Sequence, residues 1–383
     1  MGSVIASLEK ETGKTCFDSF RRSLDHERMS ILSYDDSATQ FMEAQGETER
    51  LSKPRDVSGR ARDWQENEPA FTYFLDGSRR TYKIADIPIG TQVFPVIAGQ
   101  VGVGVCKREN RTLSPCNLML HSVMALPDKL DSDGKGEKQH RVFFANLASK
   151  LNQAQRQFQL DSVLWYETNA DAKDDFEDKG VAHIQDFMIE KEKAMVQWLV
   201  DENLLNDRNW LIKDGSLEYS NVAADNPFAF SKIRSNYKRV VGVSKSFNPE
   251  LAKLTNNRSA ARMIADLAPF HRTPVSMYST ERVGGKFAIW YVRLRESRWS
   301  RSPFGGVVKV EKILTTSREE EYGLDTAEVD NISAWLVNER NPVCYGKDER
   351  WANHLYPVYL TEAFIKKYGI RNQSFSGVTN GNE

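Results

Sequence analysis

At Phe71 the chain changes from polar, charged sequence to a series of short apolar runs with the composition of β-strands. The first run, FTYFLDG, ends in Asp-Gly, a dipeptide that is common in turns. Helix-type periodicity alternates with the later runs. Strand-like runs follow at residues 87–107, 118–126, 210–213, 238–246, 286–295 and 306–314, and helical patterns at 140–153, 181–203, 326–340 and 360–369. Such an order predicts a mixed α/β domain in which helices flank a sheet.

The residues before this series are polar and carry short helical patterns, such as Ser37 to Leu51, without a strong strand. We therefore expect residues 1–68 to form a polar, helical extension and residues 69–370 to form the main domain. Residues 371–383 (RNQSFSGVTNGNE) have the composition of a disordered tail.

Composition and charge limit the classes of protein to which this chain can belong. No apolar run approaches the ~20 residues needed to cross a bilayer, so we expect no membrane association. The four cysteines form no CxxC pair and have no His at ligand spacing, which argues against zinc and disulfides and favours the cytoplasm. The formal net charge of −1 does not exclude a nucleic-acid partner, because a local cleft can be basic on a neutral protein.

Several common motifs are missing. The chain has no Walker loop, no G-x-S-x-G elbow and no HExxH. Gly102 and Gly104 resemble part of a dinucleotide loop, but they lie inside an alternating strand pattern and the third glycine is absent. The sequence therefore predicts no ATP hydrolysis by the chain itself.

Two Asp-Gly-Ser motifs carry the first candidate chemistry. Asp76 and Asp214 are each the first polar residue after an apolar run. Either could be an ordinary turn residue that caps its own backbone. Carboxylates at the ends of adjacent strands can instead hold divalent metals beside a phosphate. The motifs leave both interpretations open.

A third carboxylate follows from helical geometry. At about 100° per residue, Glu192 lies in the middle of an apolar helix face. The apolar residues within roughly 60° of it are Val181, Met188, Ile189, Met195, Val196 and Leu199. A carboxylate on such a face must be paired or bind metal. Glu192 could be a metal ligand, part of a buried salt bridge, or a side chain that extends to solvent at the edge of the apolar face.

Basic residues supply further candidates. Lys245 follows the apolar run in VVGVSKS, where a lysine could face a phosphate as a point charge or simply be solvated. Basic clusters at Lys232 to Arg239 and Arg293 to Arg301 mix with aromatic residues, a pattern that suits a nucleic-acid backbone but also an ordinary solvated surface.

The order of these motifs resembles the NurA nuclease family. FLDGS at Asp76, the helix with Glu192, LIKDGSL at Asp214, VVGVSKS at Lys245 and LYPVYLTEA at Tyr356 together cover roughly residues 70–368. The resemblance implies an RNase H-like mixed sheet flanked by helices, related to the nuclease domain of Argonaute proteins, with extra N-terminal and C-terminal helical elements. It also implies a Mn²⁺-dependent (or Mg²⁺-dependent) DNA nuclease with a pair of ions.

The same resemblance assigns roles and partners. Asp76, Glu192 and Asp214 would be metal ligands, and Lys245 and Tyr356 would lie beside the phosphate. The chain would form a homodimer and dock on a hexameric HerA-type translocase, for which residues 1–68 could be the docking element. The pair would act in DNA end processing or anti-phage defence.

One position departs from the family pattern. The family has a His eight residues after the Tyr, where this chain has Phe364. A His can complete a metal shell or move protons, and Phe can do neither. His354 or Glu362 could compensate. The alternative is a non-catalytic or partner-activated DNA-binding regulatory subunit of the translocase.

Overall fold

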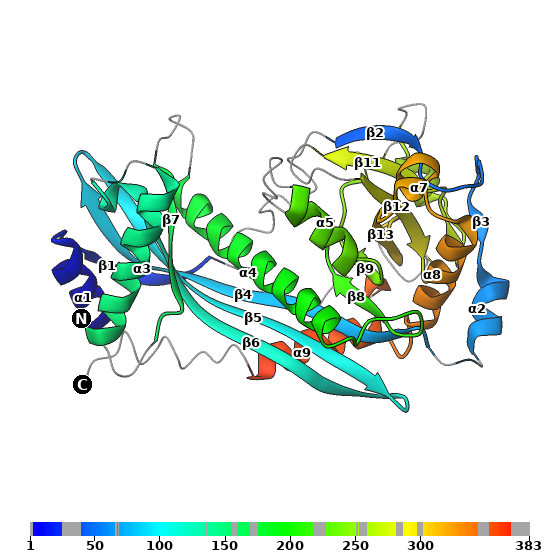
Figure 1. Ribbon diagram of the computed structural model, residues 1–383, viewed down its shortest axis with the longest axis horizontal. Helices are drawn as coiled ribbons and strands as arrows, with labels where there is room; N and C mark the ends of the chain where they lie inside the picture. The colour runs from blue at the N-terminus through cyan, green and yellow to red at the C-terminus, as the bar shows by residue number, and fades with distance from the viewer. Residues whose placement is uncertain are drawn as a thin grey trace.

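Three long antiparallel strands form the spine of the computed structural model. They are β4 (Phe71–Ile89), β5 (Gln92–Glu109) and β6 (Thr112–Pro127), and they run along the length of the molecule (Figure 1). Asp76 pairs with Gly104 of β5, and β4 continues past it to Ile89. The predicted turn at the first Asp-Gly was therefore wrong, because both residues lie within a continuous strand.

The structure describes residues 3–24, 40–65, 67, 69–132, 134, 136–154, 159–168, 175–217, 227–249, 252, 259–280, 286–296, 302–343 and 352–368. The other strands are β1 (Phe17–Ser23), β2 (Gln40–Gln45), β3 (Arg55–Asp56), β7 (Ser162–Tyr166), β8 (Trp210–Asp214), β9 (Val240–Ser244), β10 (His271–Arg272), β11 (Ser276–Thr280), β12 (Lys286–Arg293) and β13 (Val307–Ile313). The helices are α1 (Ser3–Thr12), α2 (Ser58–Gln65), α3 (Glu137–Ala154), α4 (Phe176–Asp201), α5 (Pro227–Asn236), α6 (Ala261–Ala265), α7 (Ser317–Tyr322), α8 (Thr326–Asn338) and α9 (Tyr356–Tyr368).

All of these strands belong to one 13-stranded mixed sheet, in the order β2-β11-β12-β13-β9-β8-β4-β5-β6-β7, with β1 on β4 and β10 between β12 and β3. The central strands β4, β8 and β9 are parallel, as are β6 and β7, and the other pairs are antiparallel. Helices lie on both faces, and further helices lie near both ends of the chain. The predicted α/β class, a mixed sheet flanked by helices, is confirmed.

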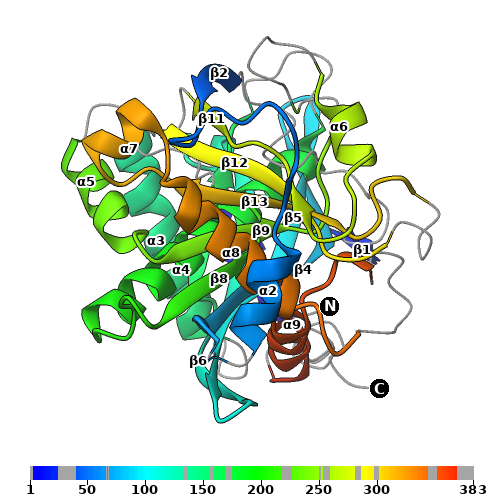
Figure 2. The ribbon, with the colours of Figure 1, turned by 90° about the vertical axis from the view of Figure 1, so that its right-hand side faces the viewer.

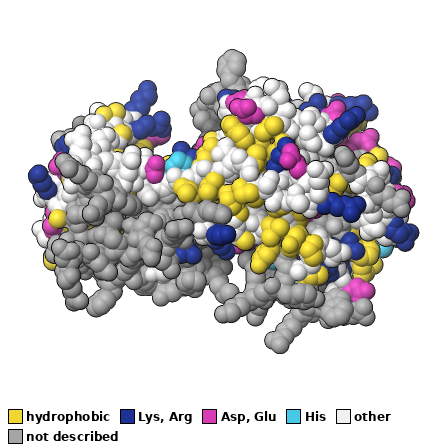
Figure 3. Space-filling view, turned by 90° about the horizontal axis from the view of Figure 1, so that it is seen from below, with side chains coloured by type: hydrophobic (Ala, Val, Ile, Leu, Met, Phe, Trp, Pro, Cys, Tyr) yellow, Lys and Arg dark blue, Asp and Glu magenta, His cyan; other side chains and the backbone are white. Residues whose placement is uncertain are grey.

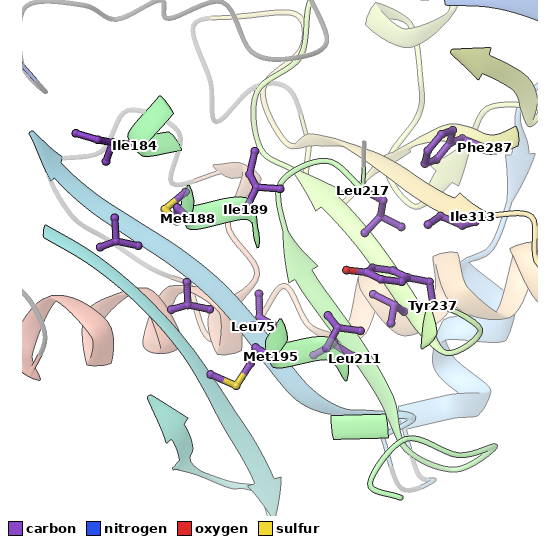
Figure 4. Close-up of a cluster of buried hydrophobic side chains, with 14 of the residues drawn as sticks. Leu75, Ile184, Met188, Ile189, Met195, Leu211, Leu217, Tyr237, Phe287 and Ile313 are labelled. Atoms are coloured by element: carbon purple, nitrogen blue, oxygen red, sulfur yellow. The ribbon is translucent and has the colours of Figure 1, made fainter. Parts of the chain in front are cut away.

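The helix α4 covers one face of the central strands. Its apolar residues Met188, Ile189 and Met195 lie over Leu75 of β4 and Leu211 of β8 (Figure 4). We call this packing the α4-side core. The face that the helical wheel predicted is the face that α4 buries, because apolar side chains three and four residues apart share one side of a helix.

The helices α8, α2 and α9 lie on the other face of the sheet (Figure 2). This α8-side core joins Phe74 of β4 and Val241 of β9 to α8 and to Val358 of α9. Gly102 and Gly104 let α9 approach β5, since a Cβ at either position would lie 2.8 Å from Ile365. Their role is to allow close packing of helix and strand.

Described strands from the first 68 residues are part of the sheet. Among them, β1 pairs with β4, β2 with β11 and β3 with β10. The predicted absence of strands was wrong, and residues 40–45 of the expected helical pattern form β2. The division at residue 68 and the docking role stay predictions, and the predicted tail, 371–383, lies outside the described residues.

A buried ion network ties this N-terminal segment to the rest. The Arg272 guanidinium bonds Glu47 at 3.0 and 2.7 Å and Asp330 of α8 at 2.7 Å. Arg55 of β3 donates to the same Asp330 carboxylate at 3.1 Å. Three segments that are distant in sequence therefore share one charge cluster, which Arg55 connects to the surface.

No helix in the described part of the chain has both the length and the apolar character that crossing a membrane requires.

Replacing Arg272 tests this network. Arg272→Met leaves Glu47 and Asp330 without their main partner, so we expect the free energy of unfolding to fall by about 3–5 kcal/mol in urea denaturation. The control is Arg141→Met, which removes an exposed pair with Glu137 and should change stability little. Equal effects of the two substitutions would contradict a stabilising role for the buried network.

Candidate metal centre

Three carboxylates from distant parts of the chain meet at the central strands. Asp76 of β4, Asp214 at the end of β8 and Glu362 of α9 each offer an oxygen within 4.8 Å of the others. The sequence predicted the two aspartates, and the structure brings them together. Glu362 was named only as a possible substitute for the missing His, and its position is the main addition that the structure makes.

Strand register explains how the aspartates meet. The parallel strands β4 and β8 pair with Leu75 opposite Lys213, so the next residues, Asp76 and Asp214, lie side by side. Successive side chains alternate between the two faces of a sheet. Leu75 packs in the α4-side core, and Asp76 therefore faces the side covered by α9. The helix α9 then supplies Glu362 to the same side.

Lys245 lies directly beside these carboxylates. Its Nζ is 2.7 Å from Asp214 Oδ2 and 3.5 Å from Glu362 Oε2. The residue follows β9, which is parallel to β8, and its backbone carbonyl accepts a hydrogen bond from Asn353 at 2.9 Å. Because Asn353 lies just before α9, this bond fixes the strand end relative to the helix that carries Glu362.

The three carboxylates of the cluster lie close together, and Lys245 neutralises part of their negative charge. Burial, and then the charge of Asp214, raise the pKa of Asp76 well above its usual value, against the effect of Lys245. Burial works to raise the pKa of Glu362 as well, but Lys245 and Lys366 lower it on balance, with His354 acting in the same direction. The carboxylates raise the pKa of Lys245 despite its burial.

These residues suit a divalent cation. With every group ionised, the carboxylates of Asp76, Asp214 and Glu362 carry −3 and Lys245 carries +1, which leaves a formal charge of −2. Carboxylate oxygens are the ligands that Mg²⁺ and Mn²⁺ prefer. Side-chain exposure of 13% for Asp214 and 23% for Glu362 leaves the cluster open to solvent on one side. The cluster is thus compatible with divalent metal binding.

Glu192 lies on the other face of the sheet. Its carboxylate pairs with Lys213 at 2.9 Å, and both side chains are buried. Burial raises the pKa of Glu192, and Lys213 opposes that effect. The helical wheel correctly placed Glu192 in the core, and the geometry corresponds to the buried salt bridge that the sequence left open. The structure does not bring Glu192 into the three-carboxylate cluster.

Gly77 explains how Glu192 reaches the sheet. A Cβ at position 77 would lie 2.5 Å from Glu192 Oε1 and 3.1 Å from Met188 Sδ. Gly215, in the second motif, has a different role, since its φ of +86° forms a turn that is strained for other residues. The two Asp-Gly-Ser motifs therefore need glycine for different reasons.

Most of the C-terminal motif lies in the first turns of α9. Tyr356 begins α9 and is half-buried, and its role beside a phosphate stays a prediction. Phe364 follows Glu362 by two residues, which at about 100° per residue puts it on the opposite side of the helix. His354 is buried, and its ring packs edge-on against Tyr359. Of the two proposed substitutes for the family His, Glu362 is the one in the cluster.

Of the two basic clusters, the one that begins at Arg293 differs from the predicted nucleic-acid track, whereas Lys232 and Lys238 of the other are exposed. Arg293 is buried and donates to the backbone carbonyls of Gly305 and Pro303, and Arg295 is buried against the carbonyl of Ala352. These arginines satisfy backbone groups and are not a surface track; residues 297–301 lie outside the described part. On the described part of the face seen from below, Lys and Arg side chains are scattered among hydrophobic ones (Figure 3).

Gly77→Ala tests the close approach of Glu192. The added methyl group must displace the Glu192 carboxylate or shift β4, so we expect a loss of about 1–3 kcal/mol in unfolding free energy. Gly59→Ala is the matched control, because a Cβ there meets no atom within 4 Å and α2 should gain helix propensity. If Gly77→Ala were as stable as Gly59→Ala, the tight contact would not exist in solution.

Comparison with known proteins gives a distant structural likeness. No protein-family model matches this chain, and no curated protein matches it. Among solved structures, it is similar to the crystal structure of the NurA nuclease from Sulfolobus solfataricus, with a TM-score of 0.40 and 10% identity over 81% of this chain and 83% of that one. At that distance the likeness assigns no activity to this chain.

Proposed function

We propose that this chain is a metal-dependent nuclease that hydrolyses phosphodiester bonds of DNA. The observation that carries the proposal is the meeting of Asp76, Asp214 and Glu362 beside Lys245 on one face of the central parallel strands. Clustered carboxylates with an adjacent cation are what metal-assisted attack on a phosphodiester requires. The order of motifs that resembles the NurA family independently supports the same chemistry.

The proposal assigns the carboxylates to the metal and the other residues to the phosphate. Asp76, Asp214 and Glu362 would hold Mn²⁺ or Mg²⁺, with a second ion as the resemblance implies. A bound ion would act as a Lewis acid on the phosphate and would lower the pKa of a water molecule bound to it. Lys245 binds the scissile phosphate as a point charge, which is possible once a metal takes over the neutralisation of Asp214 and Glu362. Tyr356 would contact the same phosphate.

The ligand role first predicted for Glu192 is less well supported than that of Glu362. Glu192 is already neutralised by Lys213 on the far side of the sheet, whereas Glu362 lies on the same side as both aspartates. We therefore propose Asp76, Asp214 and Glu362 as the protein ligands.

The proposed partners come from the resemblance alone. They are a second copy of this chain and a HerA-type hexameric translocase, acting in DNA end processing or anti-phage defence. Because residues 1–68 contribute β1, β2 and β3 to the sheet, their deletion would damage the fold. Substitutions on their exposed surface are a better test of docking than truncation.

Cleavage of linear DNA with Mn²⁺ tests the proposal directly. We expect the wild-type protein, alone or with its translocase, to degrade the DNA and Asp214→Ala to abolish degradation, because the variant loses a ligand. Asp207→Ala is the control, since Asp207 is a largely exposed aspartate paired with Arg239. Degradation that persists in Asp214→Ala would refute the assignment.

Calorimetric titration with Mn²⁺ tests the ligand set. Glu362→Gln should weaken binding by at least about tenfold, the lower end of the effect seen even for outer-shell partners. Glu190→Gln, on the exposed side of α4, should leave the affinity unchanged. Equal affinities in both variants would remove Glu362 from the proposed ligands.

A second candidate function is that of a non-catalytic regulatory subunit, and the presence of Phe364 where the family has a His favours it. Failure of the wild-type protein to bind Mn²⁺, with translocase binding intact, would favour this alternative. Because Phe364 lies across the helix from Glu362, Phe364→His should not raise Mn²⁺ affinity. A gain of activity in that variant would show that the chain had lost its chemistry at this position.

A further inference from the structure

The turn that follows Asp214 is held by two buried charged side chains. Lys213 Nζ donates to the carbonyl oxygens of Asp214 and Ser216, each at 3.1 Å. Glu311 Oε2 accepts from the Ser216 hydroxyl at 2.8 Å and from the Leu217 amide at 2.7 Å. Four hydrogen bonds thus fix the backbone from Asp214 to Leu217.

Each of these side chains has its own buried counter-ion. Glu192 of α4 pairs with Lys213 at 2.9 Å, and Lys309 of β13 pairs with Glu311 at 2.6 Å. All of these side chains are at most 6% exposed. Pairing of each charge holds the two side chains that contact the turn in a defined position.

The two pairs lie on the face opposite to the carboxylate cluster. Lys213 precedes Asp214 in β8, so their side chains point to opposite faces of the sheet. Leu217, at the end of the turn, packs in the α4-side core on the same face as Lys213. It lies against Gly242, and a Cβ at position 242 would be 2.6 Å from the Leu217 Cγ. The Asp214 side chain therefore projects toward Glu362, whereas the backbone of its turn is hydrogen-bonded by Lys213 and Glu311 on the opposite face of the sheet.

Stability alone does not account for this arrangement. A buried ion pair is often no more stable than apolar residues of the same volume, because both charges lose their hydration. A turn that must direct one carboxylate has a different requirement, since metal ligands are oriented by the groups that hydrogen-bond to them and to their backbone. Here two pairs converge on the turn that carries the central ligand of the cluster.

We propose that Lys213 and Glu311, held by Glu192 and Lys309, are positioning residues that fix the Asp214 carboxylate for metal binding. Glu192 acts through Lys213 and not as a ligand. The inference rests on the proposed function for the role of the metal, whereas the holding of the turn is a property of the chain itself.

Hydrogen exchange of the Leu217 amide measures the holding directly, and Mn²⁺ calorimetry measures its consequence. Ser216→Ala removes one bond to Glu311, and we expect faster exchange at Leu217 and roughly fivefold weaker Mn²⁺ binding, the value of one hydrogen bond. Glu311→Gln removes the charge that faces Lys309, and we expect a loss of about 10–100-fold.

Ser333→Ala is the matched control, because Ser333 is a buried serine whose hydroxyl bonds Trp290 and the carbonyl of Val329, away from the cluster. This variant should lose comparable global stability without affecting Leu217 exchange or Mn²⁺ affinity. If Ser216→Ala behaves like Ser333→Ala in both measurements, the proposal is overturned, even where Glu311→Gln fails to fold.

A double-mutant cycle tests the role of Glu192. If Glu192 acts through Lys213, the loss of Mn²⁺ affinity in Glu192→Gln combined with Lys213→Met will equal the loss in Lys213→Met alone. Losses that multiply would instead make Glu192 a ligand and overturn this part of the proposal. A wild-type protein without nuclease activity both alone and with its translocase, but with Leu217 exchange that responds to Ser216→Ala, would refute the proposed function and leave the positioning role standing.

Discussion

Consecutive side chains of a β-strand point to opposite faces of its sheet, and the organisation of this site depends on that constraint. On β8, Lys213 points to α4 and Asp214 to α9, and on β4 Gly77 faces α4 while Asp76 faces α9. One face of the central strands therefore carries the three-carboxylate cluster, and the other carries the ion pairs that we propose to position it. The sheet keeps the two sets of charges apart although they are adjacent in sequence.

The repulsion within the cluster is reduced from the same face of the sheet. Burial raises the pKa of Asp76, and so does the nearby charge of Asp214. Lys245 reduces this repulsion, and a divalent cation would reduce it further. On the opposite face, each buried charge has one partner, so the interior has no need of a metal there. The site is thus electrostatically unsatisfied on one face only.

Local periodicity made part of this arrangement predictable. The burial of Glu192 followed from its place among apolar residues on one helix, whereas the nearness of Asp76 and Asp214 was one of two interpretations that their places after apolar runs left open. The partner of Glu192 and the arrival of Glu362 depend on which strands and helices become neighbours, and single-sequence patterns do not contain that information. The same limit applies to Arg293, whose charge suggested a surface although it binds backbone carbonyls in the interior.

The position of α9 has a consequence for the order in which the chain is made. Asp76, Asp214 and Lys245 are synthesised well before Glu362, and the Asn353 side chain that fixes the end of β9 is also late in the sequence. Because translation proceeds from the N-terminus at a finite rate, a nascent chain holds only two of the three carboxylates until α9 emerges. Completion of the three-carboxylate cluster is therefore coupled to synthesis of the last described helix, and the proposed hydrolytic activity would begin only after α9 has packed on the sheet.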